Sequence, residues 1–328
     1  MKNLTLIFVL FIGLVSNAQT TFKFTTAKST EIATALKNTT YVVLNVSKPD
    51  EKVNISYEKI NNEEVVDQAD KGKSEFDGDE NEYNKFMREA IEKLWKITKY
   101  EFITQEKFDQ IWQDTDKNFI YTTIQKEKDG EAKYTTLNLV FAIGGKAPKQ
   151  DKLKRISGIQ YYYGNLDADF HLWKIPGLIK FLQHHAEYAS GNAGLTGEEG
   201  QMKIIDHYKE NNSKVSRDFR LIIYQSDLTS KVYNREAIEA IYKGDFEITD
   251  DPSIITEAIY KGENVAWFHK IAPEGSLVDK NSGEKYGVTI KYIFSAIDGE
   301  MLYSYEDPIA KKNPEGINAQ DFKALKSK

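Results

Sequence analysis

The five-residue sequence Arg-Glu-Ala-Ile-Glu occurs twice in this chain, at residues 88–92 and again at residues 235–239. Around both copies, apolar residues recur at the three- and four-residue spacing of an amphipathic helix. The apolar segments that follow each copy keep nearly the same order and offset. This repeat constrains the fold more than any other feature, because it indicates that one supersecondary unit has been used twice.

Each copy predicts a leading strand, the repeated helix, a short strand, a second helix, a third strand and a closing hairpin. In the first copy these segments lie at residues 41–46, 83–95, 100–103, 105–112, 118–121 and 136–143. In the second they lie at residues 219–224, 232–242, 246–248, 252–260, 264–267, 288–297 and 301–305. Asp129-Gly130 and Asn281-Ser282-Gly283 supply residues that accept the positive φ of hairpin turns.

We therefore expect an α/β (α+β) chain of two tandem β-α-β-α-β-β-β modules, each a mixed sheet with helices packed on it. Helical crossovers favour parallel neighbouring strands, while the closing hairpins must be antiparallel. The first module is predicted at residues 19–165, with an acidic loop at 61–81. The second, at 166–310, begins with extra helices. Residues 311–328 are predicted to be a loose polar tail with at most a short helix after Asn318.

The first 18 residues have the pattern of a signal peptide. Lys2 precedes an apolar run at residues 4–15, and the small residues of Ser16-Asn17-Ala18 suit cleavage. The apolar run is much shorter than the roughly 20 residues of a membrane-spanning helix. Since the chain contains no cysteine, neither a lipid anchor on cysteine nor a disulfide can form. We expect an exported protein, periplasmic or extracellular, without a transmembrane helix after cleavage.

Composition and motifs predict neither a nucleic-acid partner, nor a cofactor, nor a metal site. The formal net charge is -6 and basic residues are interspersed with acidic ones, whereas phosphate-backbone binding needs a concentrated basic face. Gly144-Gly145-Lys146 lacks the first glycine of a phosphate-binding loop and the Ser or Thr after its lysine, and is interpreted as a turn or loop. Residues 77–81 begin like a calcium loop but lack its later ligands, so Asp79 or Asn81 is expected to cap the following helix. No catalytic residue is identified.

Five side chains are the candidate ligand contacts: Tyr161, Tyr163, His171, His207 and His269. Tyrosines can stack on sugars or anchor a protein interface. In a regular strand, Tyr161 and Tyr163 share one face and Tyr162 takes the other, and packing within the fold is the simpler interpretation. The histidines could converge only through tertiary structure, and packing is again the simpler interpretation for them.

The segment Ala296-Ile297-Asp298-Gly299-Glu300-Met301-Leu302, placed after a strand-helix-strand unit, resembles the periplasmic α/β modules of the TolB N-terminus and of curli-secretion-type lipoproteins. The resemblance covers about one half of the chain at a time. The chain departs from the curli proteins because it lacks their lipid-bearing cysteine. The resemblance implies an envelope assembly or interaction module without catalysis.

The leading functional hypothesis is an exported, non-enzymatic envelope protein that binds another protein or a small ligand. One alternative is a secreted hydrolase, with carboxylates or a histidine converging in a cleft between the modules, where ligand sites often lie. The other is glycan binding through the tyrosines, which requires that Tyr161 or Tyr163 be exposed.

Overall fold

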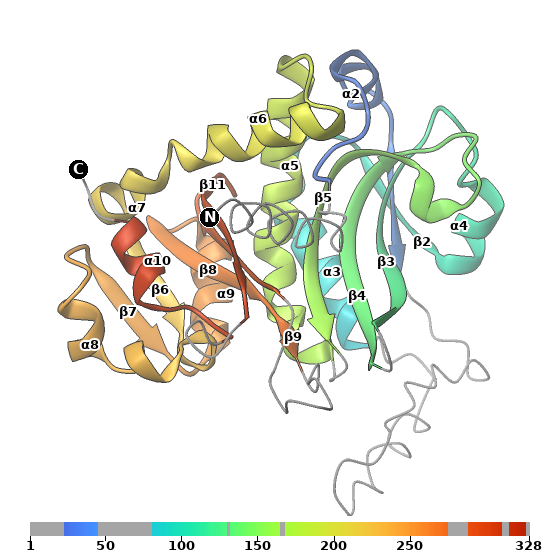
Figure 1. The fold of residues 1–328 in the computed structure, drawn as a ribbon. Coiled ribbons are helices and arrows are strands. Elements are labelled where there is room, and N and C mark those ends of the chain that lie inside the picture. Colours follow the sequence, from blue (N-terminus) through green and yellow to red (C-terminus); the bar gives the residue numbers. More distant parts are fainter. Residues whose placement is uncertain are drawn as a thin grey trace, which may run out of the picture.

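The computed structural model describes residues 23–44, 81–129, 132–164, 168–274, 288–309 and 315–325. The chain forms two mixed sheets with helices packed on them, which confirms the predicted fold class (Figure 1). The predicted signal peptide, nearly all of the acidic loop and the two hairpin turns lie outside the described residues. Within the described ranges, no helix combines the length and apolar character that crossing a lipid bilayer requires.

The first module has strand order β2-β1-β3-β4-β5, with β1 parallel to β2 and β3 and the remaining pairs antiparallel. Helices α3 and α4 connect the parallel strands and lie on opposite faces of the sheet, as the crossovers require. Its elements are α2 (Ser29–Ala35), β1 (Thr40–Leu44), α3 (Glu82–Leu94), β2 (Tyr100–Thr104), α4 (Gln105–Ile111), β3 (Asn118–Asp129), β4 (Ala132–Ile143), a 3-10 turn (Gln150–Lys152) and β5 (Lys154–Gly164).

The second module repeats this topology with strand order β7-β6-β8-β10-β11 and the same parallel and antiparallel pairs. The short β9 instead pairs with β5, so it extends the first sheet. Its elements are α7 (Asn212–Asp218), β6 (Arg220–Tyr224), 3-10 turns (Gln225–Asp227 and Ser230–Val232), α8 (Arg235–Glu239), β7 (Phe246–Thr249), α9 (Pro252–Lys261), β8 (Val265–Ile271), β9 (Pro273–Glu274), β10 (Val288–Ser295), β11 (Met301–Pro308) and α10 (Ala319–Ala324).

The repeated pentapeptide has the same local role in both modules. An asparagine precedes each copy of the helix and caps it: Asn81 accepts from the backbone of Asn84 at 2.8 Å, which confirms the predicted cap. Asn234 does the same for α8. The arginine of each copy then lies over an aromatic ring of the neighbouring edge strand, Arg88 over Phe102 and Arg235 over Phe246.

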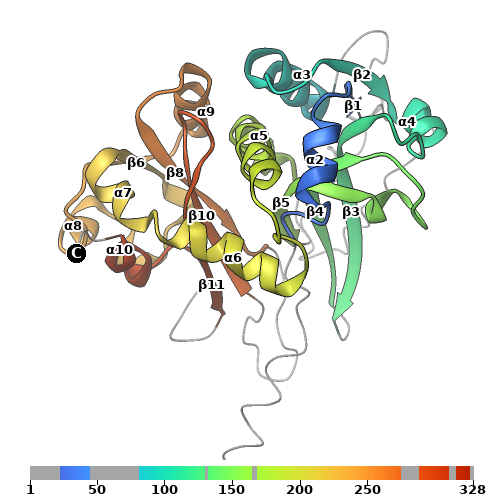
Figure 2. The same cartoon turned by 90° about the horizontal axis from the view of Figure 1, so that it is seen from above.

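Helix α5 (Ile175–Gly191) lies between the two sheets and joins them (Figure 2). Leu178, Ile179, Phe181 and Leu182 are all fully buried, and Lys180 and Gln183 are buried as well, whereas Glu187 near the end of the helix is exposed. One face of α5 meets α3 of the first module and another meets α9 of the second, within one continuous hydrophobic core. The two modules are therefore stacked front to back, because α9 corresponds to α4 and not to α3.

Between the modules the chain passes through a 3-10 segment (Ala168–Lys174), and α5 is followed by α6 (Gly197–Lys209) and α7. The predicted boundary near residue 165 lies outside the described residues, just after β5 ends at Gly164. Helix α5 follows that boundary in the sequence, yet it packs against α2 and α3 of the first module as well as α9 of the second.

The short helix expected after Asn318 is present as α10, but residues 315–325 are packed against the second module and are not loose. Ile317, Phe322 and Leu325 are fully buried against α8 and the outer face of the second sheet. Asp321 is also fully buried and accepts from Lys291 at 2.8 Å, with both side chains excluded from solvent. The tail is polar in composition, but its few apolar residues share one face, and this segment closes the second core.

Candidate binding groove

The tyrosines at 161–163 are packing residues of β5. Tyr161 and Tyr162 are each 2 % exposed and Tyr163 is half-buried, and all three contact the main hydrophobic core. The expected alternation of faces fails because β5 bulges there: Leu137 pairs with Tyr162 and Asn138 with Gln160, which leaves Tyr161 as the extra residue. Of the two tyrosines on which glycan binding was based, only Tyr163 retains partial access to solvent.

His171 and His269 lie together where β5 meets β8, at the junction of the modules. His269 is fully buried, and its Nε2 lies 3.0 Å from the backbone oxygen of Gln160. Burial lowers the pKa of His269 well below its ordinary value, and the positive charge of Lys174 acts in the same direction. His171 packs against the ring of Tyr162. The pair connects the two sheets in the interior.

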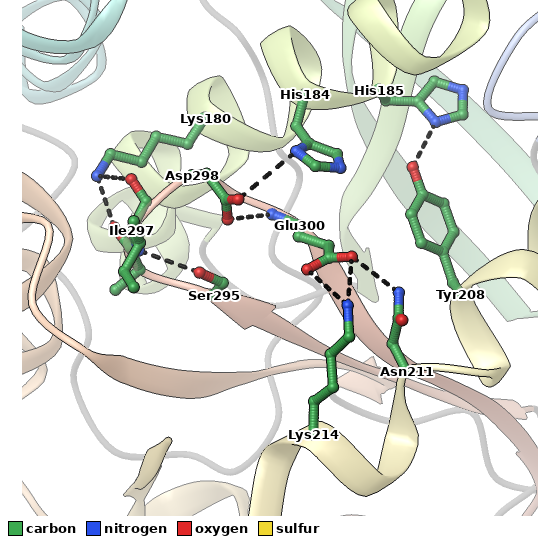
Figure 3. A network of polar contacts seen from close by, with 11 residues as sticks. Lys180, His184, His185, Tyr208, Asn211, Lys214, Ser295, Ile297, Asp298 and Glu300 are labelled. Atoms are coloured by element: carbon green, nitrogen blue, oxygen red, sulfur yellow. Dashed lines mark hydrogen bonds and ion pairs between the residues drawn. The ribbon is translucent and has the colours of Figure 1, made fainter. Parts of the chain in front are cut away.

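His207 lies apart from this pair, on α6, where its ring stacks on Tyr188 with 4.3 Å between centroids. The neighbouring His185, on α5, is fully buried, and its Nδ1 lies 2.9 Å from the hydroxyl oxygen of Tyr208 (Figure 3). Burial lowers the pKa of His185 to about 3, so the ring is neutral at physiological pH. The predicted histidines thus occupy two separate places in the fold.

A polar network joins α5 to the turn between β10 and β11 (Figure 3). The ammonium of Lys180 donates to the backbone oxygens of Ile259, Ala296 and Ile297 at 2.6, 2.5 and 3.1 Å. Burial lowers the pKa of Lys180 to about 8, while the carboxylate of Asp298 opposes that shift. The three carbonyls favour the ammonium form, and Lys180 fixes the turn against the helix.

The hydrolase alternative requires carboxylates or a histidine that converge in a cleft between the modules. Helix α5 occupies the space between the sheets, and the described titratable groups there, Lys174, Lys180, His185 and His269, make hydrogen bonds within the protein. Among the residues that the structure describes, no group of three or more His, Asp or Glu side chains is arranged to hold a metal ion.

The first module instead has a hollow of about 580 Å³ between α2 and the connection that joins β4 to β5. We call this hollow the α2 groove. Its polar residues stand on both walls, and its apolar residues lie between them. The groove is lined by Thr30, Glu31, Thr34, Ala35, Asn38, Thr115, Ile143, Gly144, Gly145, Lys146, Ala147, Lys152, Leu153 and Lys154.

Gly144 and Gly145 shape the end of the groove where β4 stops. Their N–H groups donate to the backbone oxygens of Lys117 and Trp112, at 2.9 and 3.1 Å. A Cβ at Gly144 would overlap the backbone oxygen of Asp114, so only glycine fits there. Gly144 and Gly145 are thus loop residues whose amides are occupied by backbone oxygens, not free to bind a phosphate.

The corresponding corner of the second module has a much shorter connection. There the β10–β11 connection is the short turn at Asp298-Gly299-Glu300, and Glu300 accepts from Asn211 at 2.9 Å and from Lys214 of α7 at 3.2 Å. In the first module Glu31 of α2 pairs with Lys154 at 2.5 Å, with the charges exchanged. The two corners share this ion pair but not their connections, which span residues 144–153 in one and 296–300 in the other.

The sequence contained one signal for this site. The segment after Ala142-Ile143 and the segment after Ala296-Ile297 begin alike, and only the first is long. Gly144-Gly145-Lys146 partly matches a phosphate-binding loop, but the incomplete match gave no indication of a groove.

Comparisons of the chain with protein-family models, with curated proteins and with solved structures found no match. The resemblance to TolB and curli-secretion modules stays a prediction.

Proposed function

We propose that this chain is an exported, non-enzymatic binding protein of the cell envelope, and that the α2 groove holds its partner. The observation that carries the proposal is the difference between the repeated modules. They share strand order, helix placement and the ion pair at the corner, yet the first has a long connection where the second has a tight turn. An added segment that opens a hollow favours a use beyond folding.

The dimensions and lining of the groove support binding. A volume of about 580 Å³ lies within the usual range for ligand sites, roughly 300–1,000 Å³. Its walls combine apolar contact area with hydroxyl, amide and ammonium groups that can fix orientation. The connection is held in place by the glycine hydrogen bonds and by the hydroxyl of Tyr121, which donates to the backbone oxygen of Gln150 at 2.7 Å.

Export is supported by the first 18 residues, where Lys2, an apolar run and Ser16-Asn17-Ala18 follow the order of a signal peptide. The assignment to binding in place of catalysis is supported by the positions of the buried titratable groups. Lys174, Lys180 and His269 each bond to a backbone oxygen, which is a structural use of groups that a catalytic site would need accessible.

Site-specific photo-cross-linking in the native cell tests the proposal. A photoreactive amino acid replaces Thr34, which is exposed and lines the groove, or Lys231, which is exposed on the second module. We expect one reproducible adduct in the exported fraction from position 34 and none from position 231. Equal adducts from both positions, or none at 34, would contradict a partner site in the groove.

A further inference from the structure

The charged residues that line the α2 groove are unequal in sign. Three are cations, Lys146, Lys152 and Lys154, and Glu31 is the one carboxylate. Glu31 is matched by Lys154, which is the main cause of the lowered pKa of Glu31. The ammonium groups of Lys146 and Lys152 therefore have no carboxylate partner among the residues that line the groove.

Neither remaining cation is strongly neutralised by the protein. Lys152 lies 3.4 Å from Asp151, but that carboxylate is shared with Lys149 at the same distance. Lys146 is exposed, and among the described residues it makes no ion pair. The wall formed by the β4–β5 connection thus presents a positive edge in a chain whose formal net charge is -6. An anionic ligand at this edge would replace the water and counter-ions that now screen the two ammonium groups.

The opposite wall has a regular spacing. Thr30, Thr34 and Asn38 line the groove from α2 and its C-terminal turn, at intervals of four residues. Between Thr30 and Thr34 the helix rises about 6 Å, close to the roughly 6.6 Å repeat of side chains on one face of an extended polypeptide, and Asn38 follows beyond the end of the helix. The two spacings match closely enough for alternate residues of an extended segment to meet successive polar groups of the α2 wall.

The lining between the two walls is apolar, from Ala35, Ile143, Ala147 and Leu153. A peptide backbone with small side chains can cover such a surface while its carboxylates reach the lysines. A fully hydrated inorganic anion gains nothing from it, because its hydration would have to be removed without replacement.

We infer that the α2 groove binds an acidic segment of a partner polypeptide in an extended conformation, with carboxylates of that segment at Lys146 and Lys152. The inference rests on the proposed function, since it names the chemistry of the partner that the groove holds. Both lysines are exposed, so their replacement alters the charge of the site without disturbing the core.

The test uses a rhodamine-labelled octapeptide of alternating Glu and Ala, and its counterpart in which Gln replaces Glu. Binding to the purified chain is followed by fluorescence anisotropy. We expect K146Q/K152Q to weaken binding of the Glu peptide by about tenfold, and K231Q by less than about twofold. The Gln peptide should bind about tenfold more weakly, and raising the ionic strength from about 0.05 to about 0.3 M should weaken the Glu peptide.

Equal affinity for the two peptides, or no effect of K146Q/K152Q, would overturn the inference. Displacement of the Glu peptide by equimolar glutarate would also overturn it, in favour of a site for small organic anions. The cross-link from position 34 separates the two claims. If that adduct forms while the Glu peptide does not bind, the proposed function stands and the acidic partner is wrong. If neither occurs, both fail.

Discussion

Gly299, in the turn between β10 and β11, offers a direct test of how the second module is fixed to α5. Its φ of 79° is a conformation that L side chains rarely adopt. A Cβ added there would lie 2.5 Å from the backbone nitrogen of Phe181 and would overlap the carbonyl carbon of Lys180. Since both atoms belong to the backbone of α5, the helix cannot yield by a rotamer change.

The cost of Gly299→Ala has two parts. The backbone conformation alone costs about 1–2 kcal/mol for alanine. The overlap then forces the turn away from α5, which weakens the bonds from Lys180 to Ala296 and Ile297. A hydrogen bond to a charged group contributes about 1.5–3 kcal/mol. We therefore expect Gly299→Ala to lower the free energy of unfolding by about 3–5 kcal/mol.

Gly197 supplies the matched control, because its φ is 78° and an added Cβ would meet nothing within 4 Å. Gly197→Ala should cost only the conformational part, about 1–2 kcal/mol. Urea unfolding of both variants, followed by tryptophan fluorescence and by circular dichroism, gives the two free energies. If both variants lose the same free energy of unfolding, the turn does not press against the backbone of α5, and the reasoning is refuted.

Two further predictions concern buried charge. Asp321→Asn should lower the free energy of unfolding in urea by about 3–5 kcal/mol, because the substitution removes the carboxylate that pairs with the buried Lys291. Glu257→Gln, in an exposed pair, should cost less than about 1 kcal/mol. Similar losses in the two variants would contradict this prediction. The pKa of His185 is about 3 in the fold against 6.5 ordinarily, so below pH 6.5 only the unfolded chain takes up the proton. Stability should then fall by about 1.4 kcal/mol per pH unit toward pH 3, with His269 adding to the loss. His185→Gln should reduce this slope, and an unchanged slope would contradict the assignment.

The order of elements could be predicted because the repeat gave two readings of the same unit. The pentapeptide fixed the alignment of the two copies, and the segments after it follow in nearly the same order and offset in both. Of the two caps, Asn81 was predicted from the residues before its helix, whereas Asn234 was not named and its helix was expected to begin at residue 232.

The relation between the modules could not be predicted, because it depends on which faces meet α5. One clue was present: Leu178-Ile179 and Phe181-Leu182 make this helix apolar on successive sides, which is typical of a helix buried all round. The bulge at Tyr161 left no such clue, because a one-residue irregularity changes the face of a side chain without changing the composition of its strand.

Front-to-back stacking makes the two equivalent corners different in their surroundings. In the second module Lys180 and Gly299 hold the corner turn against α5, so any lengthening there would disturb the joint between the modules. In the first module the connection is held by backbone bonds to Trp112 and Lys117 of the same module. An insertion at this corner therefore leaves the core and the joint intact. Of the two copies, the first was free to open a groove, and its positive edge is where we expect the partner to bind.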